Sequence, residues 1–141
     1  TPFKSDGIEI NAIARFCGEK RLTLFVHLSS NGDAVKLLNL AKDYPRTNFV
    51  LLHLIGLETV AQRARQMDNI HYEISAFSYI KENRLRYAID KLGADRVILG
   101  SDTPWDKGSL RNGIARVDRL DITGTEKERI LGRNITDILK P

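Results

Sequence analysis

Four polar residues in this sequence have the types and the spacing of an active site built from successive units of one fold. They are His27, His53, Ser75 and Asp102, and they follow one another at intervals of 26, 22 and 27 residues. Each interval is close to the roughly 30 residues of one strand–helix–strand unit. Imidazole and carboxylate groups together are the donors that zinc or a similar divalent ion selects, so the pattern indicates a metal site.

The segments that contain or precede these residues predict strands. Four short apolar runs rich in β-branched and aromatic residues cover residues 22–28, 48–54, 70–75 and 96–100. Three of them are almost continuously hydrophobic, as parallel strands covered on both faces are. Because active sites of parallel α/β folds lie at the carboxyl ends of the strands, we expect the four polar residues to share one rim.

Side-chain alternation predicts what lies beneath that rim. Phe49 and Leu51 precede His53 by four and two residues, so they are expected to point to the same side of the sheet as His53. The same rule places Phe25 with His27 and Gly100 with Asp102. Glu73 is left open between an interior and a solvent-facing position.

Helical periodicity follows each predicted strand. A capping pattern over residues 30–33 opens a helix that ends before Pro45, and Gly93 closes another. The remaining expected helices are one that begins at Asp6, those over residues 58–66, 83–92 and 109–120, and two short pieces capped by Thr125 and Asn134.

This alternation predicts an α/β fold with a parallel sheet, either open and doubly wound or part of a (β/α)8 barrel. A complete barrel needs about 250 residues and eight strands. The chain has 141 residues and four predicted strands, so it can form at most half a barrel. Neither a repeat nor a linker is visible, and residues 1–141 are expected to be a single domain.

Composition excludes some classes of partner. The net charge is +4, but the basic residues are scattered among acidic ones, as in residues 126–129, and a nucleic-acid partner is therefore not expected. No apolar run reaches the roughly 18 residues of a membrane span, and no targeting signal is visible. A cytoplasmic location without membrane contact is the resulting expectation.

Three stretches carry a resemblance to a known family. They are FVLLHLIG at residues 49–56, ILGSDTPW at residues 98–105 and ILGRNITDIL at residues 130–139. Together they resemble the closing third of the amidohydrolase superfamily, especially its amidohydrolase-related branch, and the similarity extends from about Asp6 to Pro141. The resemblance implies the C-terminal part of a TIM-like (β/α)8 barrel.

The resemblance also implies roles for the rim residues. His27 and His53 match metal-ligand histidines of the fifth and sixth strands, and His53 matches one that in some members orients the substrate. Asp102 matches a carboxylate that touches the metal and takes a proton from the attacking water. Ser75 is expected to line the pocket of a small-molecule substrate, which would be an amide, an ester, a lactone or the acid of a related decarboxylase. Trp105 is expected either to contact that substrate as a wall of the pocket or to pack the last loop against the barrel.

One part of the family's site is missing from the sequence. The family has a His-x-His pair after its first strand, whereas the third histidine here, His71, lies near the start of a predicted strand. A catalytic zinc normally has three protein ligands and an open position. We therefore expect this polypeptide alone to bind metal weakly and to be inactive, with the N-terminal half of the barrel supplied by another segment or a second chain.

Two alternatives remain at this point. A metal-dependent deoxyribonuclease of the TatD type would share the histidines and the final aspartate, but that family usually has Glu-Thr-Asp where this chain has Gly100-Ser101-Asp102. A non-catalytic open α/β interaction domain would explain the length, although it would expose two sheet edges.

Overall fold

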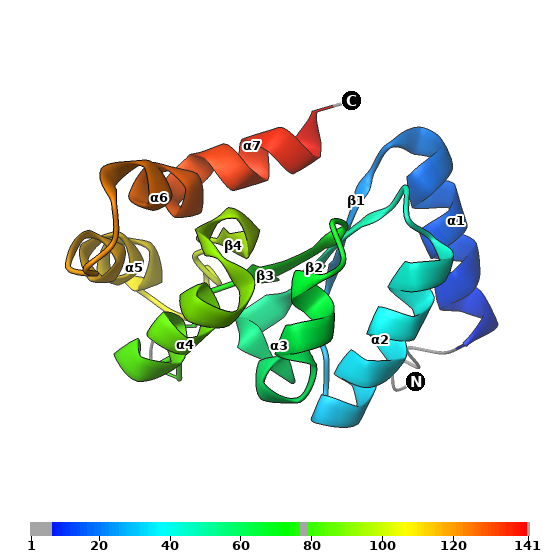
Figure 1. Cartoon of the computed structure of the whole chain (residues 1–141), viewed down its shortest axis with the longest axis horizontal. Coiled ribbons are helices and arrows are strands. Elements are labelled where there is room, and N and C mark those ends of the chain that lie inside the picture. The colour runs from blue at the N-terminus through cyan, green and yellow to red at the C-terminus, as the bar shows by residue number, and fades with distance from the viewer. Residues whose placement is uncertain (1–6, 77–78, 141) are drawn as a thin grey trace.

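Four parallel strands form one sheet in the order β1-β2-β3-β4 (Figure 1). The structure is a computed structural model and describes residues 7–76 and 79–140. The strands are β1 (Thr23–Val26), β2 (Asn48–Leu51), β3 (Ile70–Glu73) and β4 (Val97–Ile98). Each lies within a run predicted from the sequence, so the expected parallel α/β sheet is confirmed.

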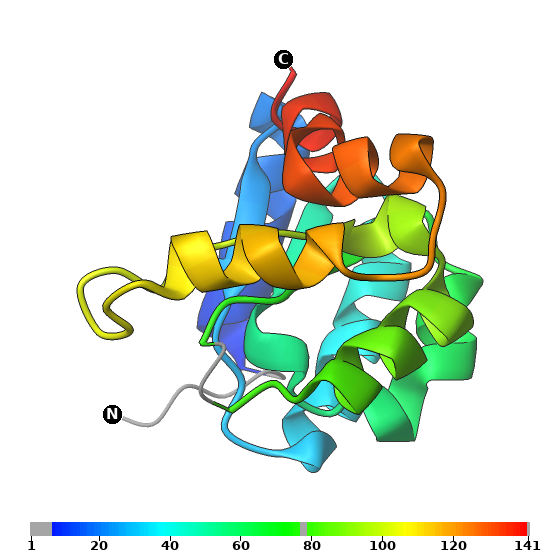
Figure 2. The same cartoon turned by 90° about the vertical axis from the view of Figure 1, so that its left-hand side faces the viewer.

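Helices connect the strands and continue after the last one. They are α1 (Ile8–Lys20), α2 (Asn31–Asp43), α3 (Leu57–Arg65), α4 (Glu82–Leu92), α5 (Ser109–Asp118), α6 (Gly124–Glu128) and α7 (Asn134–Leu139), with 3-10 turns at Leu52–Leu54 and Ala94–Arg96 and a π-helical turn at Arg129–Arg133. Helices α2, α3 and α4 pack side by side in chain order (Figures 1 and 2). Among the described residues, no helix is long and apolar enough to span a membrane.

The two faces of the sheet differ in what covers them. Register partners in a parallel sheet point to the same face. One face therefore presents Leu24, Val26, Phe49, Leu51, Ile70, Tyr72 and Val97, which belong to or pack against the core cluster that includes the helices. The other face presents Thr23, Phe25, Asn48, Val50, His71, Glu73 and Ile98, and in a closed barrel this face would line the interior.

The edge of the sheet at β1 is open. Leu22 is 48% exposed and Phe25 is 46% exposed, although both are large apolar residues in or beside a strand. Ile13 and Phe16 of α1 are also about half exposed. An apolar edge strand of this kind is a surface that another strand or segment can cover.

The C-terminal helical segment crosses the amino ends of the strands. Asn134 is 3% exposed, and its side-chain amide donates hydrogen bonds to the carbonyl oxygens of Ala94 and Val97 at 2.7 and 2.8 Å. The hydroxyl of Thr23 donates to the carbonyl of Ile138 at 2.7 Å. These bonds attach α7 to the beginnings of β1 and β4.

Two predicted helix caps are wrong. The cap of α6 is Thr123, which forms a reciprocal capping box with Glu126, so Thr125 lies inside the helix. Asn134 lies in a continuous helical stretch, and its side chain is used for the tether to β4. The expected cap at Asp6 falls outside the described residues.

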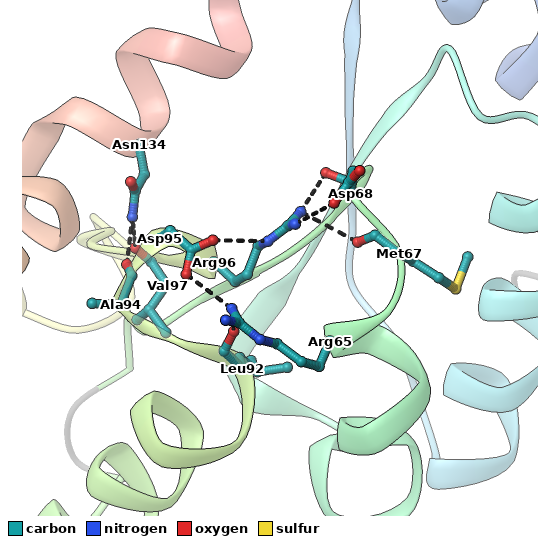
Figure 3. A network of polar contacts seen from close by, with 9 residues as sticks. All are labelled: Arg65, Met67, Asp68, Leu92, Ala94, Asp95, Arg96, Val97 and Asn134. Atoms are coloured by element: carbon teal, nitrogen blue, oxygen red, sulfur yellow. Dashed lines mark hydrogen bonds and ion pairs between the residues drawn. The ribbon is translucent and has the colours of Figure 1, made fainter.

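Charged side chains reinforce the same end of the sheet (Figure 3). The Arg96 guanidinium lies 2.6 Å from the Asp68 carboxylate and donates to the Met67 carbonyl at 3.2 Å. Arg65 pairs with Asp95 at 3.0 Å and also donates to the Leu92 carbonyl. The segment before β4 is thereby joined to the segment before β3 and to the end of α3.

His71 is a buried ionisable residue on the sheet face away from the helices. It is 6% exposed, and its Nδ1 atom has no hydrogen-bond partner among the residues that the structure describes. Burial, with a contribution from the positive charge of Arg96, lowers the pKa of His71 to about 4. The unfolded chain, with a histidine pKa of about 6.5, therefore binds a proton between these two values that the folded chain does not.

We predict that this proton makes the free energy of unfolding fall between pH 7 and pH 4. The contribution of His71 is about 2–3 kcal/mol, since the unfolded state binds more protons throughout this window. His71→Phe should remove this contribution. The free energy of unfolding of the variant minus that of wild type should therefore rise by about 2–3 kcal/mol as the pH falls from 7 to 4. Urea unfolding of both proteins at each pH measures this difference, and the contributions of other titrating groups such as Glu73 cancel in it. A difference that stays constant with pH would contradict the prediction.

Candidate active site

The backbone leaves the extended conformation where three of the strands end. Four non-glycine residues with positive φ lie just after β2, β3 and β4: His53 at 60°, Leu54 at 55°, Ala76 at 57° and Asp102 at 53°. The left-handed region costs an ordinary residue about 1–2 kcal/mol. Such strain is often found at functional sites, where the surrounding contacts over-determine the conformation. Two of the residues that carry it, His53 and Asp102, were predicted from the sequence to be functional.

This backbone turn corrects one expectation. Phe49 and Leu51 were expected to point to the same side as His53, but they face the helices and are fully buried in the core. Strand β2 ends at Leu51, and the 3-10 turn with a left-handed His53 interrupts the alternation. The alternation of side chains along a strand therefore does not predict the direction of the His53 side chain.

The structure brings the four spaced polar residues together. The ring centroids of His27 and His53 lie 5.1 Å apart in an edge-to-face arrangement. Nε2 of His53 lies 4.0 Å from Oδ1 of Asp102, and Nδ1 of His53 lies 3.1 Å from the hydroxyl oxygen of Ser75. The prediction that successive units deliver these side chains to one rim is confirmed.

A fifth polar residue, Glu73, lies beneath the rim. Its carboxylate accepts hydrogen bonds from the Ser75 amide at 2.7 Å, the Ser75 hydroxyl at 2.9 Å and the His53 amide at 3.4 Å. Glu73 is 5% exposed, and burial raises its pKa while these hydrogen bonds oppose the shift. The open question about its position is answered in favour of the interior.

Gly100 makes room for this carboxylate. A Cβ atom built at Gly100 would lie 1.8 Å from Oε1 of Glu73, a distance at which two atoms cannot coexist. The sequence did contain a signal for Glu73: it precedes Ser75 by two residues in a predicted strand over residues 70–75, which places both side chains on one face. The cross-strand contact with Gly100 becomes visible only once the sheet is assembled.

The two residues expected to bind substrate lie in different environments. Ser75 is 2% exposed, and its hydroxyl contacts His53 and Glu73. Trp105 is 86% exposed, so it does not wall a pocket formed by the described residues. Contact of either residue with substrate stays a prediction.

His27, His53 and Asp102 are residue types that bind divalent ions, but their arrangement does not form a complete metal site. Two imidazoles and a carboxylate are suitable ligands for zinc. However, within residues 7–76 and 79–140 no group of three His, Cys, Asp or Glu side chains is arranged to hold an ion. The side chains of His53 and Asp102 are 15% and 28% exposed, which leaves both accessible from the rim. The chemistry of these residues fits part of a metal site, and a complete site would need further ligands.

Comparisons with known proteins identify the relatives of this chain. The amidohydrolase family model matches residues 2–140. No curated protein matches the sequence. Among solved structures, an uncharacterised TIM-barrel protein from Bordetella bronchiseptica superposes with a TM-score of 0.81 at 18% identity, over 99% of this chain and 53% of its own.

Two further structures carry a metal. A dihydroxybenzoic acid decarboxylase from Polaromonas sp., with bound manganese and the inhibitor 2-nitroresorcinol, has a TM-score of 0.79 at 14% identity over 99% of this chain and 56% of its own. An amidohydrolase from Burkholderia multivorans with bound zinc has a TM-score of 0.73 at 16% identity over 96% of this chain and 58% of its own. This chain therefore spans a little over half the length of these proteins and has the fold of a partial TIM barrel.

We predict that Gly100→Ala destabilises the protein by about 1–3 kcal/mol, because the new methyl group forces the Glu73 carboxylate out of its position. The matched control is Gly132→Ala, where a Cβ atom meets nothing within 4 Å. In a helical position that substitution should be neutral or stabilising by up to about 1 kcal/mol. Chemical denaturation of both variants measures the effect, and equal stabilities would show that Glu73 does not need this space.

Proposed function

Because this chain belongs to the amidohydrolase family, we propose that it supplies the C-terminal half of the active site of a metal-dependent enzyme. The observation that carries the proposal is the convergence of His27, His53 and Asp102 at one rim. The two imidazole rings are 5.1 Å apart, and the second lies 4.0 Å from the carboxylate. These groups come from three different strand ends, as the residues of a barrel active site do.

The cofactor of this proposal is a divalent ion, zinc or manganese. Manganese is bound in the Polaromonas decarboxylase and zinc in the Burkholderia amidohydrolase, which supports the class of ion. His27, His53 and Asp102 would hold it together with ligands from outside this chain. When bound, such an ion polarises a substrate oxygen and lowers the pKa of a water molecule.

Asp102 is the proposed proton carrier. Its side chain is 28% exposed at the rim and faces Nε2 of His53, so it can reach both a water molecule and a substrate. In hydrolysis it would accept the proton of the attacking water and return it to the leaving group. In decarboxylation the protonated form of Asp102 would deliver its proton to the carbon that loses carbon dioxide, and the resulting carboxylate would take up a new proton from solvent. The alternative role of His53, in place of a ligand of the ion, would be to orient the substrate's oxygen atoms.

Hydrolysis of an amide, ester or lactone is the leading proposal, and decarboxylation of an aromatic acid is the second. The structural similarity to the Polaromonas decarboxylase supports keeping the second reaction. The deoxyribonuclease alternative is disfavoured because this chain has Gly100 where the TatD pattern has glutamate. The Glu73 carboxylate occupies the space that a side chain at position 100 would need.

The rest of the barrel is part of the proposal. This chain covers 53–58% of the three solved structures described above. β1 is an edge strand, Leu22 beside it is 48% exposed, and Phe25 on the interior face is 46% exposed; further strands would cover both residues. We infer that additional strand–helix units, from another segment or a second chain, complete the barrel and the metal site. The cytoplasmic location and the inactivity of the 141-residue chain by itself stay predictions.

We predict that Asp102→Asn lowers kcat by about 10²–10⁴-fold, because the amide cannot carry the proton. The enzyme would be the protein with a completed barrel, supplied with zinc or manganese. Its substrates would be 2,6-dihydroxybenzoate, followed by carbon dioxide release, and a panel of esters, lactones and amides, followed by acid release. Asp90→Asn on the exposed face of α4 is the control and should leave kcat unchanged.

Each result of this assay bears on the proposal. Turnover of an ester, lactone or amide supports hydrolysis, and turnover of the aromatic acid supports the decarboxylase. Full activity in Asp102→Asn would contradict the role of the carboxylate. A tightly bound, stoichiometric metal and activity in the isolated 141-residue chain would contradict the need for another half.

A further inference from the structure

We propose that Glu73 is a positioning residue which, through Ser75, holds the neutral ring of His53 with its proton on Nδ1 and its Nε2 lone pair at the rim. The inference rests on the proposed function in one respect: the use of the free Nε2 is to bind an ion or a substrate. The contacts that carry it involve only residues of this chain.

The first step is the set of donors around Glu73. Oε1 accepts the backbone N–H of Ser75 at 2.7 Å. Oε2 lies 3.4 Å from the backbone nitrogen of His53, which also donates, and 2.9 Å from the Ser75 hydroxyl. Two of these three partners are amides that can only donate, so the carboxyl group is oriented by the backbone as an acceptor.

The second step is the single proton of the Ser75 hydroxyl. A hydroxyl donates one hydrogen bond and accepts others. With its proton directed to Oε2 of Glu73, the Ser75 oxygen can only accept from Nδ1 of His53, which lies 3.1 Å away. Nδ1 must therefore carry the proton of the neutral ring.

The third step is the charge beside Nδ1. Oε2 of Glu73 lies 3.7 Å from this nitrogen, so an N–H at Nδ1 is attracted and a lone pair there is repelled. The opposite tautomer would turn the Ser75 proton toward Nδ1 and leave Oε2 with only the long contact to the His53 amide. Both effects favour Nδ1–H. The Asp102 carboxylate acts in the opposite sense on Nε2, but its Oδ1 lies farther away, at 4.0 Å, and makes no hydrogen bond to the ring.

The consequence lies on the other side of the ring. Nε2 faces Oδ1 of Asp102 at 4.0 Å, and the ring packs edge-to-face with His27. A histidine that binds a metal or takes a proton uses the nitrogen that its hydrogen-bond partner leaves free. Glu73 thus selects Nε2 as the working atom of His53 without reaching the rim.

The tautomer can be read directly by 15N NMR of histidine-labelled protein. We would use the folded protein that carries this chain, free of metal, at a pH two to three units above the ordinary histidine pKa of about 6.5. In wild type we expect the protonated nitrogen of His53 to be Nδ1, in roughly tenfold or greater excess, the ratio that one hydrogen bond supports.

Glu73→Gln should reverse the tautomer. The amide oxygen of the new side chain would take the place of Oε1 and accept from the Ser75 amide, which leaves its NH2 group facing the Ser75 hydroxyl. The hydroxyl would then accept from this NH2 group and donate to Nδ1 of His53. The proton should accordingly move to Nε2, a change that a purely structural role for Glu73 does not predict.

Two further variants keep the test decisive. Ser75→Ala removes the connecting hydroxyl and should abolish the preference for Nδ1–H even if Glu73→Gln folds poorly. Glu19→Gln, on the exposed surface of α1, is the matched control and should leave the His53 signals unchanged. Amide spectra of each variant establish that it is folded.

Wild type with its proton on Nε2, or a folded Glu73→Gln variant with the wild-type tautomer, would overturn the inference. The activity assay of the completed barrel reports separately on the proposed function. The expected tautomers in a protein without any turnover would therefore reject the function and retain the positioning role. Turnover with an unchanged tautomer in Glu73→Gln would reject the positioning role alone.

Discussion

The rim of this half barrel depends on one buried carboxylate. Glu73 connects β2 to β3 by accepting from the backbone of His53 and of Ser75, and it packs against the next strand at Gly100. A buried charge without partners costs several kcal/mol, so these contacts are needed for the carboxylate to remain in place. In turn they hold the left-handed backbone of His53, and with it the ring that faces Asp102.

The amino ends of the strands carry stabilising contacts, whereas the carboxyl ends carry the candidate site. At the amino ends, Arg96 with Asp68 and the Asn134 amide with β4 form direct tethers that add stability (Figure 3). At the carboxyl ends, positive φ angles at His53 and Asp102 store backbone strain. The contacts at the amino ends add stability that offsets the free-energy cost of the backbone conformation at the rim.

Much of this architecture could be predicted from the sequence, because hydrophobic periodicity is a local signal. The four strands, their helices and the shared rim of His27, His53 and Asp102 all followed from run lengths and spacing. The prediction that Phe49 points to the same side as His53 was wrong, because side-chain alternation fails once the backbone turns at the end of β2. The role of Glu73 depends on contacts across neighbouring strands, with Gly100 and His53, which no local pattern contains.

The central claim is that His53 and Asp102 present a metal-dependent site at this rim, with Nε2 as the free nitrogen of the histidine. Anomalous diffraction from crystals of the protein with a completed barrel, grown with zinc or manganese, tests it most directly. We predict one ion within about 2.0–2.2 Å of Nε2 of His53 and in contact with Asp102. An ion bound through Nδ1, or anomalous scattering only at sites away from the rim, would contradict the account.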